Sequence, residues 1–385
     1  MKIAFFTYTR LEYGGGVAKY YIETASGLAK RYKNLKIDII SFEKKTLRKF
    51  LLLYFLYFFG KQDMDQKDKE NIISIKKKLG FAGYYQYNFK SLLKKLKGYD
   101  LIYTTNNLLE VMLFKYLIGY RHIPPIVYGF HIPMYYEFTS SLQSKIHNLL
   151  YRSPLYIKAL KGAKVLHVMN TFDEDIIKDK FNIHNVKKIY YAFNFDQFAK
   201  VVFEYKPPYK WNKLRTNILW TGRLTEQKGI DKLFEIIEGV NAGKCGKKII
   251  WNIFGDGELK DRVRAFSLKH KNVSFFGYVE NRFMADIMNK CDFFISTSNW
   301  ESFPYNILEA QAFGLPVVCF DISGCNDIVK DGVNGYLVTD TAEFKKRIND
   351  IVIKNKFKKE KIRNYIVSRF NFEDLFSKMY RLFTE

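Results

Sequence analysis

The sequence has 385 residues, of which 48% are apolar, so two domains with full-sized cores are expected and a disordered chain is excluded. The formal net charge is +24, and residues 1–195 carry +17 of it against +7 for residues 196–385. This excess of positive charge favours an anionic partner, which is nucleic acid, a phosphorylated substrate or a membrane surface. The alternative is a solvated, lysine-rich protein surface without such a partner, and the charge alone leaves both interpretations open.

Cysteine spacing and the N-terminus bear on the compartment. Cys245, Cys291, Cys319 and Cys325 show no spacing typical of a metal site or a redox pair, so we expect reduced thiols in or near the core of a cytosolic protein. The stretch MKIAFFTYTR turns polar too early for a signal peptide and lacks a cleavage site.

Strand-like runs alternate with helical patterns in both halves of the chain. A helix is expected from about Val17, with Tyr21, Ala25, Leu28 and Tyr32 on one side. Strands are expected at 2–6, 36–41, 100–105, 125–130, 164–169 and 187–191, and again at 217–222, 249–255, 272–277, 292–297 and 316–320. Such alternation predicts an α/β fold with two Rossmann-like parallel-sheet domains, 1–195 and 196–369, joined through an extended linker at 204–215.

The run KFLLLYFLYFFGK (49–61) is apolar on all sides and has basic neighbours. Its ten successive apolar residues, 50–59, would span about 15 Å as a helix, whereas a bilayer core needs about 30 Å, so the run is too short to cross a membrane. It is either a shallow dock on an anionic membrane surface or a buried helix, and both interpretations stay open. Residues 80–89 are a candidate extension of the same surface.

Ligands of open α/β sheets bind beyond the carboxyl ends of the strands, so the loops that follow strands are the places to look for chemistry. GRLTEQKG (222–229) offers Arg223 and Lys228 between Gly222 and Gly229, two cations that can neutralise a diphosphate, although such residues are commonly just solvated. WESFPYNILEAQAFG (300–314) predicts a helix from about Pro304 to Phe313, closed by Gly314. Glu301 precedes this helix and Glu309 lies inside it; they suit a sugar and a ribose diol, or are two surface glutamates.

Taken together, these motifs resemble the large family of retaining, nucleotide-sugar-dependent glycosyltransferases with the GT-B fold. Glu301 and Glu309 match its E-x7-E signature, GRLTEQKGID matches its diphosphate loop, and IFGDGELK, VSFFGYV and DIVKDGVNGYLV follow in the family's order. The match is dense over 217–340 and looser over 1–195. The variant Glu301-Ser302-Phe303-Pro304 stands where E-G-F-G is common, and Asn194 stands where relatives often have Asp.

The resemblance implies a role for each matching residue. Glu301 would contact the donor sugar, Glu309 would hold the ribose, and His131 would face the reacting sugar, although a histidine after a strand is more often structural. Arg223 and Lys228 would hold the diphosphate. The remaining donor-binding residues would be Gly15 and Gly16 of the Gly14-Gly15-Gly16 loop, with Gly222, Gly277, Tyr278, Val279, Phe303, Asn306 and Ile307. Residues 370–385 would form a terminal helix that returns to the first domain.

The sequence therefore predicts a retaining hexosyltransferase that moves a sugar from a nucleoside diphosphate sugar to a saccharide or lipid-linked acceptor, in the cytoplasm and at the inner face of the membrane. No metal or other cofactor is expected: the pair Asp63 and Asp65 follows no strand, and the GDG loop at 255–257 is an incomplete dinucleotide motif. No nucleic-acid motif is present. The alternative is a non-catalytic protein that binds nucleic acid or membrane through its basic surface.

Overall fold

The computed structural model describes residues 1–7, 16–42, 83–87, 89–138, 141–192 and 214–385. The chain divides into two compact units. Unit 1 comprises Met1–Tyr135, Ser140–Tyr191 and Glu373–Glu385, and unit 2 comprises Tyr136–Thr139 and Ala192–Phe372. The predicted boundary at 195/196 and the linker at 204–215 fall almost entirely outside the described residues.

Unit 1 is built on a parallel sheet of seven described strands in the order β3-β2-β1-β4-β5-β6-β7. They are β1 (Lys2–Thr7), β2 (Lys36–Phe42), β3 (Gly83–Tyr87), β4 (Leu101–Thr105), β5 (Ile126–Gly129), β6 (Val165–Val168) and β7 (Val186–Lys188). The residues of β4 and β5 are buried throughout, because helices cover both faces of a parallel sheet. The six predicted strands are confirmed. β3 was not predicted; it lies within residues 80–89 and pairs in parallel with β2.

The helices of unit 1 include α1, whose predicted apolar side is confirmed. Tyr21, Ala25 and Leu28 are buried in the core, and Tyr32 stacks on Tyr380 with ring centroids 4.1 Å apart. These helices are α1 (Gly16–Arg31), α4 (Phe89–Leu96), α5 (Leu108–Met112), α6 (Leu142–Leu150), α7 (Pro154–Leu160), α8 (Thr171–Asp175) and α17 (Phe372–Thr384).

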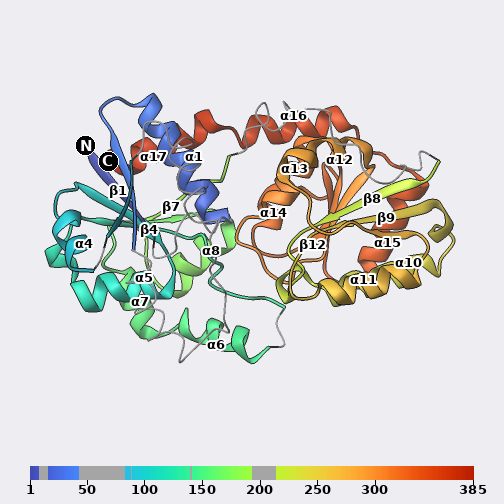
Figure 1. Cartoon of the computed structure of the whole chain (residues 1–385), viewed down its shortest axis with the longest axis horizontal. Helices are drawn as coiled ribbons and strands as arrows, with labels where there is room; N and C mark the ends of the chain where they lie inside the picture. The colour runs from blue at the N-terminus through green and yellow to red at the C-terminus, as the bar shows by residue number, and fades with distance from the viewer. Residues whose placement is uncertain (8–15, 43–82, 88, 139–140, 193–213) are drawn as a thin grey trace. The chain divides into compact units, whose positions relative to one another are not determined.

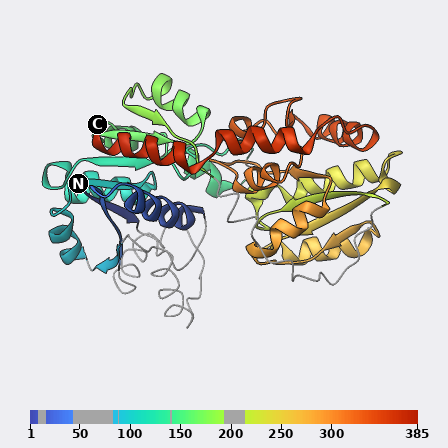
Figure 2. The same cartoon turned by 90° about the horizontal axis from the view of Figure 1, so that it is seen from above.

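The C-terminal helix α17, red in Figure 2, lies against unit 1. Arg31 of α1 forms an ion pair with Glu373, and the Phe383 ring meets that of Phe5 edge-on at 5.9 Å. The last thirteen residues of the chain are thus part of the first unit although 181 residues of other sequence separate them from its preceding segment.

Unit 2 has a parallel sheet of six described strands in the order β10-β9-β8-β11-β12-β13. They are β8 (Thr216–Thr221), β9 (Ile249–Phe254), β10 (Val273–Phe275), β11 (Phe293–Ser296), β12 (Val317–Phe320) and β13 (Gly335–Val338). Five of these were predicted and are confirmed; β13 was missed. The order places β8 and β11 side by side, so that the loops after these two strands meet at one edge of the sheet.

Helices cover both faces of this second sheet, with α10, α11 and α15 on one side and α12 and α13 on the other (Figure 1). They are α10 (Ile230–Asn241), α11 (Lys260–Lys269), α12 (Met284–Lys290), α13 (Tyr305–Ala312), α14 (Cys325–Ile328), α15 (Thr341–Ile353) and α16 (Lys359–Arg369). All four cysteines are buried free thiols, as predicted.

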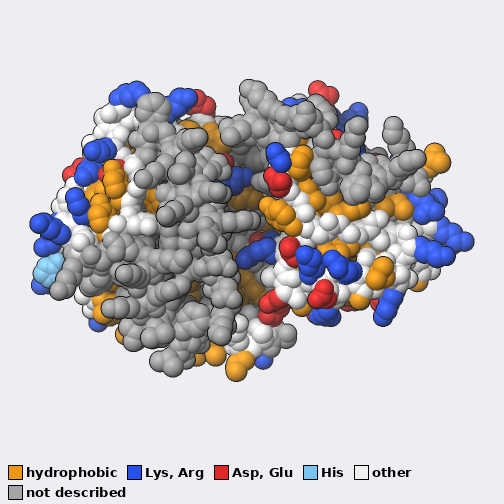
Figure 3. Space-filling view, viewed as in Figure 1, with side chains coloured by type: hydrophobic (Ala, Val, Ile, Leu, Met, Phe, Trp, Pro, Cys, Tyr) orange, Lys and Arg blue, Asp and Glu red, His pale blue; other side chains and the backbone are white. Residues whose placement is uncertain are grey.

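Several predictions concern residues that the structure does not describe: Gly14 and Gly15, the run 49–61, Asp63 with Asp65, and Asn194. Among the described residues, no helix combines the length and the apolar character needed to span a membrane. Lys and Arg side chains stand along the outer rim of unit 2 on the face drawn in Figure 3.

Candidate donor-binding site and the histidine cluster

The loops after β8 and β11 and the start of α13 come together in unit 2. α13 begins after Pro304, which is its N-cap, because proline lacks the amide proton that a helix interior needs. It ends at Phe313, and Gly314 follows with φ +76°, so the predicted helix from 304 to 313 is confirmed to within one residue at each end. Glu301 therefore stands in the loop just before the helix.

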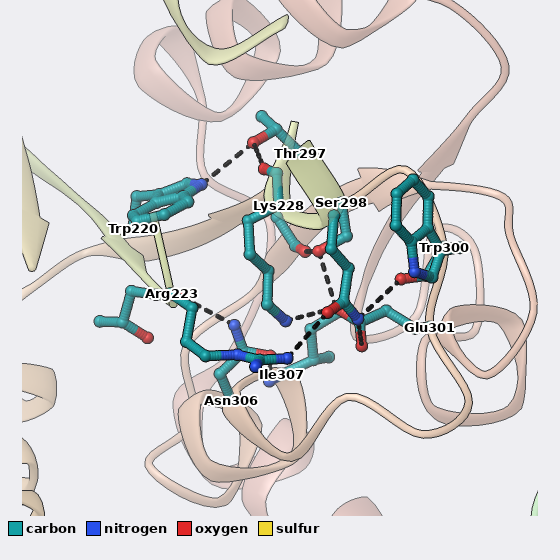
Figure 4. A network of polar contacts seen from close by, with 12 residues as sticks. Trp220, Arg223, Lys228, Thr297, Ser298, Trp300, Glu301, Asn306 and Ile307 are labelled. Atoms are coloured by element: carbon teal, nitrogen blue, oxygen red, sulfur yellow. Dashed lines mark hydrogen bonds and ion pairs between the residues drawn. The ribbon is translucent and has the colours of Figure 1, made fainter. Parts of the chain in front are cut away.

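The centre of this site is an ion pair between Lys228 and Glu301, drawn in Figure 4. Lys228 Nζ lies 2.5 Å from Glu301 Oε1, and the two side chains are 14% and 8% exposed. Ser298 Oγ donates to the same carboxylate oxygen at 2.8 Å, and Gln227 Nε2 lies 3.4 Å from Glu301 Oε2. The carboxylate is thereby fixed by groups from both loops rather than left to solvent.

Close backbone contact holds the loop after β8 on the loop after β11. Gly229 has φ +61°, and a Cβ there would lie 2.0 Å from the carbonyl oxygen of Thr297, so only glycine fits. Thr297 Oγ1 donates to the Lys228 carbonyl oxygen at 2.8 Å, and the Asn299 amide donates to the Gln227 carbonyl oxygen at 2.7 Å. The position of Lys228 opposite Glu301 follows from this contact.

Arg223 is exposed in the same loop, and its guanidinium donates to Gln227 Oε1 at 3.0 Å (Figure 4). Gln227 therefore links Arg223 to Glu301. Gly255 of the GDG loop supports this arrangement from behind, since a Cβ on it would lie 2.0 Å from the Gly222 carbonyl oxygen. The glycines of the GDG loop are required for close packing against residues 222–224, which is a structural reason for their presence.

The start of α13 is partly engaged within the chain. Asn306 Nδ2 donates to the Thr221 carbonyl oxygen at 2.8 Å and so ties the helix to the end of β8. The Ile307 amide, predicted to face a diphosphate, donates to Asn306 Oδ1 at 3.0 Å and to the Pro304 carbonyl oxygen at 3.1 Å. A ligand there would have to share or replace these bonds.

Two further predicted donor-binding residues, Glu309 and Phe303, are buried. Glu309 is 7% exposed in the middle of α13. Phe303 is 5% exposed, and its ring lies 5.7 Å from that of Phe370, so it contributes to the core.

The Gly277–Val279 stretch follows β10 at the edge of the sheet. Gly277 has φ +71° with open space where a side chain would be, and Tyr278 is 70% exposed. The stretch is thus exposed to solvent, and its role beside a nucleobase stays a prediction.

Among the described residues of unit 1, His131 lies in a buried cluster of polar rings. Its Nε2 is 3.0 Å from the Tyr103 hydroxyl, and its Nδ1 is 2.5 Å from the Tyr191 hydroxyl. The Tyr103 hydroxyl also lies 2.9 Å from Nδ1 of His167, whose Nε2 is 2.9 Å from the Ile189 carbonyl oxygen. Strands β4, β5 and β6 end beside one another and so bring this cluster together.

The pattern of donors fixes the tautomers. The Ile189 carbonyl can only accept, so His167 carries its proton on Nε2 and accepts from Tyr103 at Nδ1. At 3.5 Å the Tyr20 hydroxyl is too distant to compete for that proton. His131 must then donate from Nε2 to Tyr103 and accept at Nδ1 from Tyr191.

Burial lowers the pKa of His131 well below its usual range, and the neighbouring His167 lowers it further. Burial likewise lowers the pKa of His167 to about 4. Both rings are therefore neutral near pH 7. Because each ring nitrogen of His131 already has a partner, contact with a sugar through this ring would require one of those bonds to open.

Three residues of the unit 2 site were not singled out from the sequence: Ser298, Gln227 and Glu137, whose carboxylate accepts from the Ser323 amide at 3.0 Å. Gln227 stands next to Lys228 inside the diphosphate-loop motif, which was a usable signal. Ser298 is three residues before Glu301 in a polar loop. Glu137 carries no sequence signal, because its place beside this site depends on chain segments far apart in sequence.

Gly16 begins α1, with open space where a side chain would be.

Two parallel-sheet α/β units, each with its loops gathered at the carboxyl ends of the strands, define the GT-B fold of glycosyltransferases. Residues 202–367 match the model of the family "Glycosyl transferases group 1", so this segment of the chain is similar to that family. The match covers the Lys228–Glu301 site and stops before α17.

Two of the curated relatives have names that state a sugar-transfer activity. The chain is 27% identical over 297 residues, 73% of each chain, to the UDP-Gal:alpha-D-GlcNAc-diphosphoundecaprenol alpha-1,3-galactosyltransferase of Escherichia coli. It is 28% identical over 235 residues, 58% of this chain and 43% of the relative, to the poly(ribitol-phosphate) alpha-N-acetylglucosaminyltransferase of Staphylococcus aureus. Several relatives are matched over less than half of their own length, namely 33%, 43% and 31%.

Solved structures support the fold assignment over the whole chain. The Anabaena protein HepE in complex with UDP-glucose has a TM-score of 0.68 to this structure at 18% identity, and the match covers 99% of both chains. At this identity the likeness concerns the fold alone.

Proposed function

We propose that this protein is a retaining glycosyltransferase that moves a hexose-type sugar from a nucleoside diphosphate sugar to an acceptor hydroxyl during glycan or polysaccharide assembly. The observation that carries the proposal is the buried Lys228–Glu301 pair, linked to Arg223 through Gln227 at the carboxyl ends of β8 and β11. A carboxylate beside two cations suits a sugar joined to a diphosphate. The activities after which two curated relatives are named support the same class.

Each group would act on a defined part of the donor. Glu301 would accept hydrogen bonds from sugar hydroxyls and Glu309 from the ribose, while the Gly277–Val279 backbone would face the base. Arg223 and Lys228 would neutralise the diphosphate as it leaves, which stabilises the charge that develops in the transition state. His131, a neutral donor at Nε2, would contribute to the sugar side only after its hydrogen bonds rearrange.

We further propose that transfer needs no divalent metal, because the two cations take over the role that a metal has in neutralising the leaving group. No cluster of three metal-ligating side chains occurs in the parts of the chain that the structure describes. Activity should survive EDTA. Complete loss in EDTA that Mn²⁺ restores would contradict this and direct attention to Asp63 and Asp65.

Thermal-shift screening against UDP, GDP, ADP and their sugar derivatives is the first experiment. A ligand at 100 times its Kd should stabilise the protein by about 2.7 kcal/mol. The sugar derivative of the nucleotide that binds should then support transfer, with Glu301→Gln inactive and Glu238→Gln, a change at an exposed glutamate on α10, fully active. NMR of the product's anomeric proton would test retention. No shift with any nucleotide would contradict the proposed function.

A further inference from the structure

A short segment belongs to unit 2 although the chain before it and the chain after it belong to unit 1. We call residues 136–138 the strap. The chain on either side of it, up to Tyr135 and from Ser140, is part of unit 1, whereas Tyr136–Thr139 is part of unit 2. The strap therefore makes its contacts among the loops that carry Glu301.

Each strap residue has its own contact with these loops. The Tyr136 ring stacks on Trp300, with centroids 4.3 Å apart and ring planes 13° from parallel. The Phe138 amide donates to the Asn299 carbonyl oxygen at 3.3 Å. Between them, Glu137 Oε1 accepts from the Ser323 amide at 3.0 Å.

These contacts flank Glu301 on both sides. Asn299 and Trp300 come immediately before Glu301 in the chain. Ser323 precedes Gly324, where a Cβ would lie only 2.4 Å from the Ser302 carbonyl oxygen, so the loop touched by Glu137 is in close contact with the residue after Glu301. Residues 299–300 are therefore held by two segments. Gln227 of the loop 222–229 forms hydrogen bonds with both residues, and the strap contacts both of them as well.

We propose that the strap positions Glu301 for its contact with the donor sugar, with Tyr136 and Glu137 as positioning residues. The inference rests on the proposed function and adds residues outside the segment 202–367 matched by the family model. Neither residue is expected to touch the reacting atoms: Tyr136 acts through Trp300, and Glu137 acts through the Ser323 loop.

Glu137 is an unusual choice for a purely structural contact. Its Oε2 is buried and has no hydrogen-bond partner among the described residues. Burial raises the pKa of Glu137 to about 7, and the charge on Glu301 raises it further. An uncharged amide or an apolar side chain would fill the place at lower cost.

The ionisation of Glu137 gives the strap a pH dependence. Its pKa in the folded protein is raised, so its contribution to strap attachment is full below its ordinary value of 4.5 and is lost as the pH rises through about 7. The charged group that acts on Glu137 is Glu301, which is paired with Lys228, while the Lys232 ammonium lies 3.8 Å from the centre of the ring of the next strap residue, Phe138. Burial lowers the pKa of Lys232 to about 8, so Glu137 titrates near neutrality and Lys232 titrates above it.

The test compares Tyr136→Ala with Tyr136→Phe, which keeps the stacked ring, in the full-length protein. Hydrogen exchange without ligand should be about two- to tenfold faster in the peptide 296–303 of Tyr136→Ala, as expected for the loss of an aromatic pair, and unchanged in Tyr136→Phe. Peptide 249–254, in β9, is the internal control. Equal acceleration in both peptides, or none in either, would overturn the proposal.

Binding supplies the second measurement. Each nucleoside diphosphate is titrated together with one sugar derivative: UDP with UDP-glucose, GDP with GDP-mannose and ADP with ADP-glucose. For the pair that binds, the affinity for the sugar derivative is divided by the affinity for the bare diphosphate, and this ratio is compared between variants. Tyr136→Ala should lower the preference for the sugar derivative about two- to tenfold and leave the bare diphosphate unchanged. In Glu137→Gln the ratio should lose its pH dependence between pH 6 and 8. An unchanged ratio in Tyr136→Ala overturns the strap's role, whereas a wild-type protein that binds no nucleotide overturns the proposed function itself.

Discussion

Lys228→Met should destabilise unit 2 markedly, because it leaves Glu301 as a buried charge without its cation. At 2.5 Å and an effective dielectric constant of about 20, the attraction in the pair is roughly 7 kcal/mol. Desolvation of two side chains that are 14% and 8% exposed offsets most of it. Removal of one partner of a buried pair costs about 3–5 kcal/mol, and since Ser298 and Gln227 stay beside the carboxylate, we expect about 3 kcal/mol.

The assay is urea unfolding followed by tryptophan fluorescence. All four tryptophans, at positions 211, 220, 251 and 300, lie in the second half of the chain, so this signal reports on unit 2 and avoids the two-state assumption for the whole protein. The matched control is Lys260→Met. Its ion pair with Asp256 is 37% and 48% exposed, and its loss should cost less than about 1 kcal/mol.

A double variant separates the charge from the packing. Lys228→Met with Glu301→Gln removes both charges and keeps an acceptor for Ser298, so its stability should return to within about 1 kcal/mol of wild type. The reasoning is refuted if Lys228→Met is as stable as Lys260→Met, or if the double variant is no more stable than Lys228→Met alone.

Three further predictions concern binding, acid sensitivity and membranes. Arg223→Ala and Lys228→Ala should each weaken a nucleoside diphosphate about 10- to 100-fold by calorimetry and leave the nucleoside unchanged, and equal losses for both ligands would contradict a diphosphate role. Unit 1 should lose stability as the pH falls below 6.5, because the two histidines bind a proton in the unfolded chain while His131 and His167 stay neutral in the folded protein. For His167, whose pKa is about 4, the loss of folding free energy is about 3 kcal/mol. Hydrogen exchange of β4–β6 that does not change from pH 7 to 4, after correction for intrinsic rates, would disprove this prediction. The protein should sediment with anionic vesicles through residues 44–61 at low salt, and a protein that stays in the supernatant would remove the basis for a lipid-linked acceptor.

The strands were predictable because their apolar runs are bounded by glycine, proline and charged residues, so that eleven of them could be placed. The two that were missed lack this pattern: β3 is a run of tyrosines and glutamine, and β13 is four residues directly after a glycine-rich turn. The helix α13 was predictable from Pro304 and Gly314, which mark its ends by backbone chemistry alone.

The site was predictable as a set of residue types but not as a set of contacts. Arg223, Lys228 and Glu301 were found because they follow strands. That Lys228 pairs with Glu301 depends on β8 lying beside β11, which local sequence does not encode. The cluster around His131 joins residues from the ends of three strands and from Tyr191, and the inclusion of Glu137 in unit 2 depends on a four-residue excursion of the chain.

The pairing of Lys228 with Glu301 has a consequence for how a donor would bind. The cation proposed for the diphosphate is already held by the carboxylate proposed for the sugar, so an incoming diphosphate and Glu301 would compete for one ammonium group. As Lys228 turns toward the phosphates, Glu301 loses a strong donor and gains capacity to accept from sugar hydroxyls. A bare nucleoside diphosphate would draw Lys228 away from the Glu301 carboxylate and offer no hydroxyl in its place. A nucleotide sugar would also draw Lys228 away, but its sugar hydroxyls would donate hydrogen bonds to the carboxylate instead. Preference for the intact donor over its diphosphate product would then follow from the geometry of this single pair.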